Sequence, residues 1–599
     1  IVIDSWGKIP SGLLYGHLQD LGNFDECLDI STNLTAATGQ TNGQYCFASV
    51  PLLEDPSLKH PPLDHDKSAQ GRVYEDLITI SIGICVPDVC YPDLLTEIFQ
   101  EATVDTLNGA LKGIYVNSCM TSEKPNFEII NIVGILIFSI FGLLMLLSTL
   151  YDIYTDKFDK KTKEIYLAFS IIRNGRKLFQ ISQAKSDSSI DCLTGFRVLS
   201  MVWIILCHCY SMSPMLPMIN KFDLIPWFKA ASTMHITMAT VSVDTFFFIS
   251  GLLIAWLGFR ELDKSNGKLN ISLMYLHRYI RLTPPLAAVI LYNVAIDKYI
   301  GTGPLREVYK EFNGNCRDNW WSTLLYIQNY ANPLDICVSQ TWYLAVDTQL
   351  YFLSPFVLIP LWKWGKKFIP IMFLLSFLSI GYVIVTFFDY GFNTFMGVLG
   401  DDQLRLTYIP THARFSVWLL GLGFGYFMHR IKYKSIQLPK MIQLLGWILC
   451  FALIFAIIYG PYFTINADHE TSVLEAAMYE SLRRVTWGIA LSWIIFACHF
   501  GFAGLVNAFL SHYIWQPLGR LTYSMYLVHL TVQSVHYGIT KNDVYFSDYS
   551  AILVFWGTFG TSFIAAIIVT LAFESPVLVI EKSFFHGSKQ SMDTKKETV

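Results

Sequence analysis

The chain has 599 residues, of which 53% are hydrophobic and only 15% are charged. Soluble domains carry about 25% charged residues, so this composition excludes an ordinary soluble enzyme and predicts a polytopic α-helical membrane protein. The formal net charge of −4 offers no basic surface for a polyanion, and we expect no nucleic-acid partner.

Residues 1–127 contain no apolar run long enough to cross a bilayer and are predicted to form a water-facing domain. We expect this domain to be mostly helical, with a helix over residues 93–112 where apolar positions recur at helical spacing. The sequon Asn33-Leu34-Thr35 predicts a glycoprotein, and therefore an extracellular or lumenal location.

Cysteines cluster in this region, which indicates disulfides formed in an oxidising compartment. The odd number of five predicts either one free thiol or a partner before residue 1. Cys85 and Cys90 either close a small turn together or anchor two separate bridges. A second group, Cys316 and Cys337, flanks a polar loop farther along the chain. The five residues are Cys27, Cys46, Cys85, Cys90 and Cys119.

Eleven apolar segments follow, and each is predicted to be a transmembrane helix. Residues 151–190 hold eight Lys or Arg, so this loop is expected in the cytoplasm. Alternation then sets the N-terminal domain outside and the C-terminus inside, in the plasma membrane or the endoplasmic reticulum. The segments lie near 129–150, 194–213, 240–258, 284–300, 342–362, 368–389, 413–429, 441–460, 484–504, 519–538 and 551–572.

The domain organisation follows from these boundaries. We expect a water-facing domain at 1–127 and a transmembrane domain at 128–585. The polar residues 586–599 are predicted to form a disordered cytoplasmic tail.

Arg197 and His208 are ionisable residues within one apolar segment, where charge is expensive and indicates function by default. Eleven residues separate them, which returns both to nearly the same helix face about 16 Å apart along the axis. A neutral imidazole can take a proton from a hydroxyl and return it to a leaving group. The alternatives are a snorkelling Arg197 and a His208 that only bonds a neighbouring helix.

Other ionisable residues lie near the ends of predicted spans. Arg278 and Arg281 share a helix side and suit phosphates, although they could be an ordinary basic flank. Asp244 either orients an imidazole or caps its helix. His529 is a second histidine inside a span. No spacing typical of a metal site and no nucleotide-binding glycine pattern is present, so no metal is expected.

Several motifs in this order resemble the membrane acyltransferase-3 family. They are Phe196-Arg197 with His208, residues 244–251, Arg278-Tyr279-Ile280-Arg281, Thr341-Trp342-Tyr343-Leu344 with Gln349, residues 408–414, residues 524–529 and Glu574-Ser575-Pro576. The stretches 6–14, 21–27 and 85–90 resemble the nose-resistant-to-fluoxetine domain of invertebrate members. Together the resemblance covers residues 6–582.

The resemblance implies a membrane-embedded O-acyltransferase that moves an acyl group from acyl-coenzyme A to a hydroxyl-bearing or lipid acceptor. Membrane lipids are expected as further partners. His208 would be the general base, with Arg197 and Asp244 also catalytic. The donor would be bound by Arg197, Arg278, Arg281, Trp342, Tyr343, Gln349 and Arg414. The alternative is a transporter or receptor for lipids or hydrophobic small molecules across an epithelial membrane.

Overall fold

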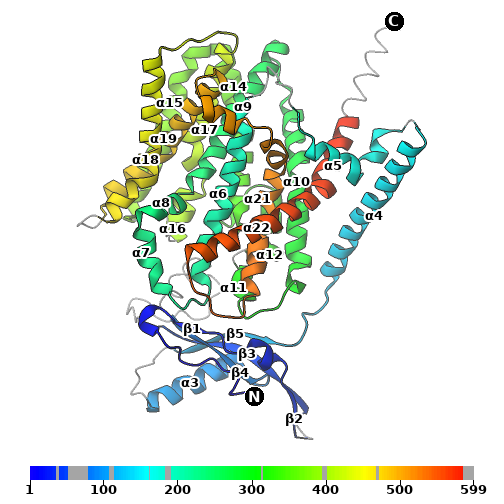
Figure 1. Ribbon diagram of the computed structural model, residues 1–599, viewed down its shortest axis with the longest axis vertical. Coiled ribbons are helices and arrows are strands. Elements are labelled where there is room, and N and C mark those ends of the chain that lie inside the picture. The colour runs from blue at the N-terminus through cyan, green and yellow to red at the C-terminus, as the bar shows by residue number, and fades with distance from the viewer. Residues whose placement is uncertain are drawn as a thin grey trace.

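The computed structural model describes residues 1–584 except 36–38, 52–78, 107–113, 161, 183–189, 312–313, 394–400 and 467–470. A small domain containing a β-sheet lies against one end of a large helical bundle (Figure 1). We call that end of the bundle the domain end and the opposite end the far end. The predicted disordered tail, 586–599, lies outside the described residues.

The N-terminal domain is built on a five-stranded sheet, so the expectation of a mostly helical domain is wrong. The strands are β1 (Gln19–Asp20), β2 (Ser31–Thr35), β3 (Gly39–Pro51), β4 (Thr79–Pro87) and β5 (Tyr115–Thr121), in the order β1-β4-β3-β2 with β5 also on β3. β3 and β4 pair antiparallel over nine residues. The β-branched residues of β4 are the sequence signal that favours a strand here, because such residues suit a pleated, half-buried surface.

Among the described residues, two α-helices accompany this sheet: α1 (Phe24–Leu28) and α3 (Pro92–Thr106). α3 is the helix predicted over 93–112, whose last residues lie outside the described part. Disulfides Cys27–Cys85 and Cys46–Cys119 tie α1 to β4 and β3 to β5. Among the described residues Cys90 is a free thiol, so a Cys85–Cys90 turn is not formed.

Each predicted span overlaps a long helix of the bundle. These are α4 (Ile129–Lys157), α6 (Cys192–Met212), α9 (Val241–Lys264), α10 (Ile271–Ala295), α14 (Trp342–Trp364), α15 (Ile369–Tyr390), α17 (Thr411–Ile431), α18 (Lys440–Ile465), α19 (Val473–His499), α21 (Trp515–Gly538) and α22 (Asp548–Val569).

Fewer than eleven of the described helices have the length and hydropathy of a membrane span. Among the described residues, six helical segments are long and apolar enough to cross a membrane, or up to seven if the bent pair α19 and α20 (Gly504–Leu510) is one span. The expected count of about eleven is therefore not confirmed. α19 buries Glu480, Arg483 and Arg484, and α10 carries Arg278 and Arg281, which lowers the mean hydropathy of both helices.

Short helices connect the long ones. They are α5 (Ile171–Phe179), α7 (Leu224–Lys229), α8 (Met234–Thr237), α11 (Arg306–Glu311), α12 (Cys316–Leu324), α13 (Gln328–Ala331) and α16 (Asp401–Gln403). α5 lies at the far end, where the guanidinium of Arg520 on α21 donates to the carbonyl oxygens of Lys177, Leu178 and Gln180. These bonds satisfy carbonyl groups that the end of a helix leaves unpaired.

The N-terminal domain shares a hydrophobic core with the domain end of the bundle. Phe24 and Tyr45 pack in one cluster with Tyr210 and Met212, which follow His208 on α6. Lys541, just after α21, forms an ion pair with Asp25 at 2.6 Å. The domain therefore covers the ends of the helices α6 and α21.

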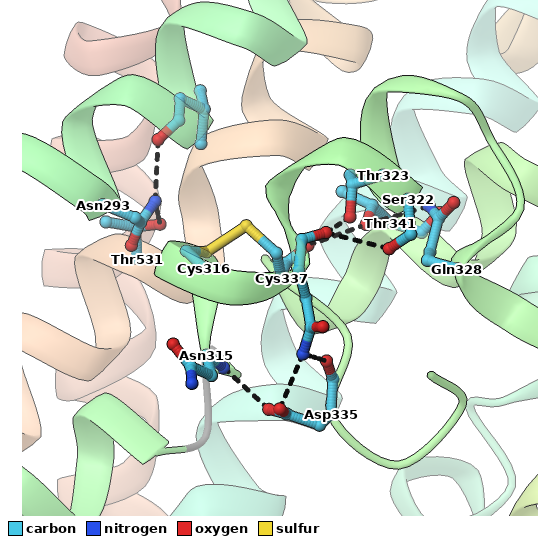
Figure 2. Close-up of a disulfide and its surroundings, with 12 residues drawn as sticks. Asn293, Asn315, Cys316, Ser322, Thr323, Gln328, Asp335, Cys337, Thr341 and Thr531 are labelled. Carbon is cyan, nitrogen blue, oxygen red and sulfur yellow. Dashed lines mark hydrogen bonds between the residues drawn. A yellow bond between two sulfur atoms is a disulfide. The ribbon is translucent and has the colours of Figure 1, made fainter. Parts of the chain in front are cut away.

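A third disulfide, Cys316–Cys337, joins α12 to the loop that leads into α14 (Figure 2). The carbonyl oxygen of Cys337 accepts hydrogen bonds from the hydroxyls of Thr323 at 3.3 Å and Thr341 at 3.2 Å. The two cysteines that flank the polar loop are thus joined to each other. The disulfide fixes where α14 begins, and α14 supplies residues to the site.

α9 and α17 approach each other closely because glycines lie at their crossing. A Cβ added to Gly421 would collide with the carbonyl oxygen of Phe248, and one added to Gly251 would collide with that of Trp418. Small residues allow the backbones of membrane helices to pack in this way. The close crossing brings Asp244 of α9 within ion-pair distance of Arg414 of α17.

Gly421→Ala should therefore destabilise the protein by about 1–3 kcal/mol, the usual cost of overpacking a core. The measurement is thermal unfolding of the purified protein in detergent or nanodiscs. Gly142→Ala on α4 is the matched control, because nothing lies within 4 Å of a Cβ there. Equal unfolding midpoints for the two variants would contradict the packing argument.

Candidate functional site

One large cavity of about 1430 Å³ runs through the bundle. Its far mouth is lined by Lys177 of α5 and Lys582, and it continues toward the domain end as far as Ala239 and Thr240. Most of its wall comes from α6, α9, α10, α14 and α21. The cavity thus connects the far mouth with the inner part of the domain end.

His208 and Arg197 both line this cavity, as their shared helix face predicts. His208 lies near the domain end, and its Nδ1 is 2.9 Å from Nε2 of His529 on α21. His529 is fully buried and does not line the cavity. The edge of the His208 ring that bears Nε2 has no hydrogen-bond partner among the described residues.

Two guanidinium groups in the cavity lining form no direct ion pair with the described residues, although the carboxylate of Asp347 interacts electrostatically with Arg197 and that of Glu574 with Arg281. Within the described ranges, neither Arg197 nor Arg281 forms a hydrogen bond or an ion pair, and the two are close enough to repel each other. Arg278 differs, because it forms an ion pair with Asp347. Asp347 also accepts a hydrogen bond from Ser250 at 2.6 Å. Of the two arginines predicted to act together, Arg278 is therefore neutralised by an ion pair, whereas Arg281 forms none with the described residues.

Asp244 does not reach His208. It is fully buried, lies outside the cavity lining and pairs with Arg414 at 2.7 Å. Arg414 is likewise buried, with its guanidinium 4.4 Å from the ring of Tyr408 and 5.4 Å from that of Trp342. Arg414 thus supports two aromatic rings that line the cavity instead of entering it.

The other residues of the predicted donor site divide in the same way. Trp342 and Tyr343 line the cavity. Gln349 lies outside it, where its amide donates to the carbonyl oxygen of Tyr326 at 2.8 Å and its oxygen accepts from Thr411 at 2.5 Å. Gln349 therefore ties α14 to α17 and to the segment before α13.

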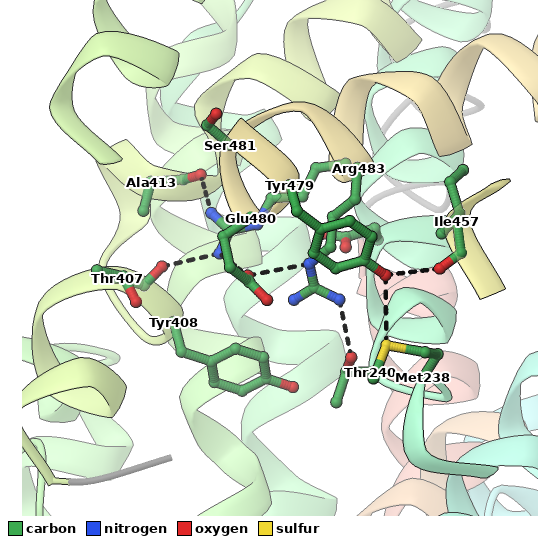
Figure 3. A network of polar contacts seen from close by, with 12 residues as sticks. Met238, Thr240, Thr407, Tyr408, Ala413, Ile457, Tyr479, Glu480, Ser481 and Arg483 are labelled. Atoms are coloured by element: carbon green, nitrogen blue, oxygen red, sulfur yellow. Dashed lines mark hydrogen bonds and ion pairs between the residues drawn. The ribbon is translucent and has the colours of Figure 1, made fainter. Parts of the chain in front are cut away.

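A second group of buried charges lies behind the cavity wall (Figure 3). Arg483 donates to Glu480 at 3.0 Å and to the hydroxyl of Thr240, a cavity residue, also at 3.0 Å. The neighbouring Arg484 donates to the carbonyl oxygens of Ala413 at 2.6 Å and Thr407 at 2.9 Å. These bonds hold α17 and α19 together, as buried charges require.

Several cavity residues were not singled out for the site from the sequence. Tyr408 and Glu574 end two π-helical segments, Leu404–Tyr408 and Thr570–Glu574, and both face the cavity. Glu574 opens the motif Glu574-Ser575-Pro576, where a proline suggests the end of a helix, but the helix continues to Phe584. π-Helical turns are frequent at functional sites, yet they depend on tertiary packing that a sequence pattern does not reveal.

Among the described residues, no three His, Cys, Asp or Glu side chains are grouped in a way that could hold a metal ion. The cavity lining holds several arginines and lysines, the carboxylates of Glu164, Glu261, Asp347 and Glu574, and the imidazoles of His208 and His277. Such an arrangement can bind an anion at one end and transfer a proton at the other.

The chain matches known families over most of its length. Residues 190–573 match the model described as "Acyltransferase domain", and residues 2–99 match "Nose resistant-to-fluoxetine protein, N-terminal domain". The chain therefore belongs to the acyltransferase-3 family of membrane proteins. Within that family it combines the acyltransferase domain with the N-terminal domain named after nose resistance to fluoxetine.

Three relatives show the extent of the similarity. Nose resistant to fluoxetine protein 6 of Caenorhabditis elegans is 25% identical over 98% of this chain and 78% of its own. Regulator of hypoxia-inducible factor 1 from the same organism is 24% identical over 69% and 84%. A Staphylococcus aureus (strain COL) protein named as an O-acetyltransferase is 24% identical over 61% of this chain and 55% of its own. No solved structure matches the chain.

Removing Asp244 tests whether it is structural. Asp244→Ala leaves the guanidinium of Arg414 buried and uncompensated, so we expect a loss of about 3–5 kcal/mol of stability. The double variant Asp244→Ala/Arg414→Met should recover much of this loss, because no bare charge remains. Thermal unfolding of the purified variants measures both.

The exposed ion pair of Asp402 and Arg405 supplies the control. Asp402→Ala should cost at most about 1 kcal/mol, as is usual for surface pairs. An Asp244→Ala protein as stable as the Asp402→Ala protein would show that the buried pair has no structural role.

Proposed function

We propose that this membrane acyltransferase transfers an acyl group from acyl-coenzyme A to a hydroxyl acceptor, with His208 as the general base. The observation that carries the proposal is one cavity that joins two unpaired guanidinium groups to a histidine. Arg197 and His208 are eleven residues apart on α6, a rise of about 16 Å. An extended donor whose charged end binds Arg197 could present its reactive end near His208.

The donor is assigned to the far end of the cavity. Arg197 and Arg281 form no direct ion pair with the described residues, and guanidinium groups bind phosphates through paired hydrogen bonds. Lys177 and Lys582 add positive charge at the far mouth, with Glu164 and Glu261 also in the lining. Phosphate groups of coenzyme A would supply the negative charge that Arg197 and Arg281 lack. Arg278, already paired with Asp347, would position neighbouring groups.

The acceptor is assigned to the part of the cavity around His208. Its wall is formed largely by aromatic rings, including Trp342, Tyr343, Tyr408 and Tyr526. Among the described residues, the side chain of His208 bonds to His529 and not to a carboxylate or a cation. An uncharged hydroxyl-bearing molecule or a lipid alcohol would suit this surface, because a charged group would be desolvated without a partner.

The proposed reaction exchanges two groups: the acyl group moves from sulfur to oxygen, and the proton moves from oxygen to sulfur. Nε2 of His208 takes the proton of the acceptor hydroxyl while its oxygen attacks the thioester carbonyl carbon. A carbon–oxygen bond forms, the carbon–sulfur bond breaks, and the proton passes from His208 to the leaving thiolate. General base catalysis of this kind contributes about 10²–10⁴-fold in rate.

The orientation follows from the same assignment. We infer that the far end faces the cytoplasm, where coenzyme A is available, and that the N-terminal domain lies outside or in a lumen. The two disulfides of that domain support an oxidising location. Glycosylation of Asn33 stays a prediction on the same side.

The alternative is transport or reception of a lipid or a hydrophobic small molecule. The size and aromatic wall of the cavity favour it, since ligand sites are mostly apolar. Binding of a hydrophobic ligand without acyl transfer, unaffected by loss of His208, would support this function over catalysis.

His208→Ala should lower acyl transfer by about 10²–10⁴-fold, because the general base is removed. The measurement is release of free coenzyme A and labelling of an alcohol pool by purified protein given radiolabelled acetyl-coenzyme A. His536→Ala is the control, since His536 lies exposed on α21 outside the cavity lining. Equal turnover in the two variants would remove His208 from the mechanism.

Arg197→Gln and Arg281→Gln should each raise the KM for the donor by about 10- to 100-fold, since a hydrogen bond to a charged group contributes about 1.5–3 kcal/mol. Competition by coenzyme A itself gives an independent binding measurement. Arg260→Gln is the control, because Arg260 is an exposed residue of α9 outside the cavity lining. Unchanged donor affinity in both cavity variants would reject this phosphate site.

A further inference from the structure

His529 contacts the proposed base but not the cavity. Its ring is fully buried on α21 and lies nearly parallel to that of His208, with an interplanar angle of 5°. Its Nδ1 is 2.7 Å from the carbonyl oxygen of Tyr526, and its Nε2 is 2.9 Å from Nδ1 of His208. Each nitrogen of His529 therefore has one defined partner.

These two contacts determine where the hydrogens lie. A carbonyl oxygen only accepts, so Nδ1 of His529 must carry its hydrogen. In a neutral imidazole the other nitrogen, Nε2, is then an acceptor. Nδ1 of His208 must donate to it, which leaves the lone pair of His208 on Nε2.

We infer that His529 is a positioning residue that holds His208 in the tautomer whose Nε2 can accept a proton. The inference rests on the proposed function, because a base is needed only for proton transfer. The hydrogen bond a histidine makes through one nitrogen sets the state of the other. When His208 takes the acceptor's proton on Nε2, its Nδ1–H stays bonded to His529, so the ring keeps its orientation and can return the proton to sulfur.

The surroundings keep His529 in place. The hydroxyl of Tyr526 donates to the main-chain oxygen of Gln340, and the side-chain amide of Gln340 donates to the carbonyl oxygen of Leu527 at 2.8 Å. Gln340 precedes Thr341, whose hydroxyl bonds the carbonyl oxygen of Cys337. A continuous series of contacts thus leads from the Cys316–Cys337 disulfide to the His208 ring.

Two substitutions separate positioning from packing. His529→Met fills the space without an acceptor, and we expect kcat to fall by about 100-fold, at the low end of what a correctly placed base contributes. The KM for acetyl-coenzyme A should stay within about two-fold, because donor binding lies elsewhere in the cavity. His529→Gln should restore kcat to within about ten-fold of the original, since an amide oxygen can accept from Nδ1 of His208.

His536→Met, at an exposed position of the same helix, controls for the added methionine. A kcat of His529→Met equal to that of His536→Met would overturn the inference, while loss of activity in His208→Ala would still support the proposed function. Equal losses in His529→Met and His529→Gln would overturn it as well, because a purely steric role predicts no rescue.

A readout without turnover separates the two hypotheses. In protein labelled with ¹⁵N-histidine, the side-chain resonances of His208, assigned by their loss in His208→Gln, should show hydrogen on Nδ1. In His529→Met this preference should disappear. Hydrogen on Nε2 in the original protein would overturn the inference even if acyl transfer is observed. Hydrogen on Nδ1 without any acyl transfer would support the inference and count against the proposed function.

Discussion

The ion pair between Asp244 and Arg414 joins the first turns of α9 and α17, where both side chains are fully buried. Burying either group alone would be strongly unfavourable, so the two helices must meet at this point, and the glycines at their crossing allow it. Arg278 is neutralised by Asp347 in the same way. Against this background Arg197 and Arg281 differ, because their cationic groups have no ion-pair partner in the described residues. The pairing of buried charges therefore separates the residues that hold the bundle together from those that can receive a ligand.

Part of this organisation could be predicted from the sequence. Arg197 and His208 were expected on one helix face, because helix geometry relates positions within one element. Their partners could not be predicted, since His529 is 321 residues from His208 and Asp347 is 69 residues from Arg278. Asp244 was grouped with the site by its position near the end of a span, yet its partner Arg414 turns it away from the cavity. The sheet of the N-terminal domain was missed for a similar reason, because its strands pair across long intervals of sequence.

The two histidines illustrate how a small number of polar contacts can be maintained inside an apolar bundle. The Tyr526 carbonyl oxygen is available to His529 because Tyr526 belongs to the preceding turn of the same helix. His208 then approaches from α6, and the contact between α6 and α21 brings the rings together. The carbonyl oxygen of Tyr526 is the last acceptor of the hydrogen bonds that run from His208 through His529, so the histidine pair needs no buried acid. An acidic partner in this position would have required a further cation, as at Asp244.

The disulfide between Cys316 and Cys337 makes the structure around the histidine pair depend on where the chain is oxidised during biosynthesis. It lies in a connecting segment, but hydrogen bonds join it to the start of α14 and from there to the turn that carries His529. A newly made chain acquires such a bond only after that segment has entered an oxidising compartment. With the orientation proposed above, completion of the membrane-embedded centre would depend on maturation in the secretory pathway. Copies held in a reducing environment would lack the support on one side of their histidine pair.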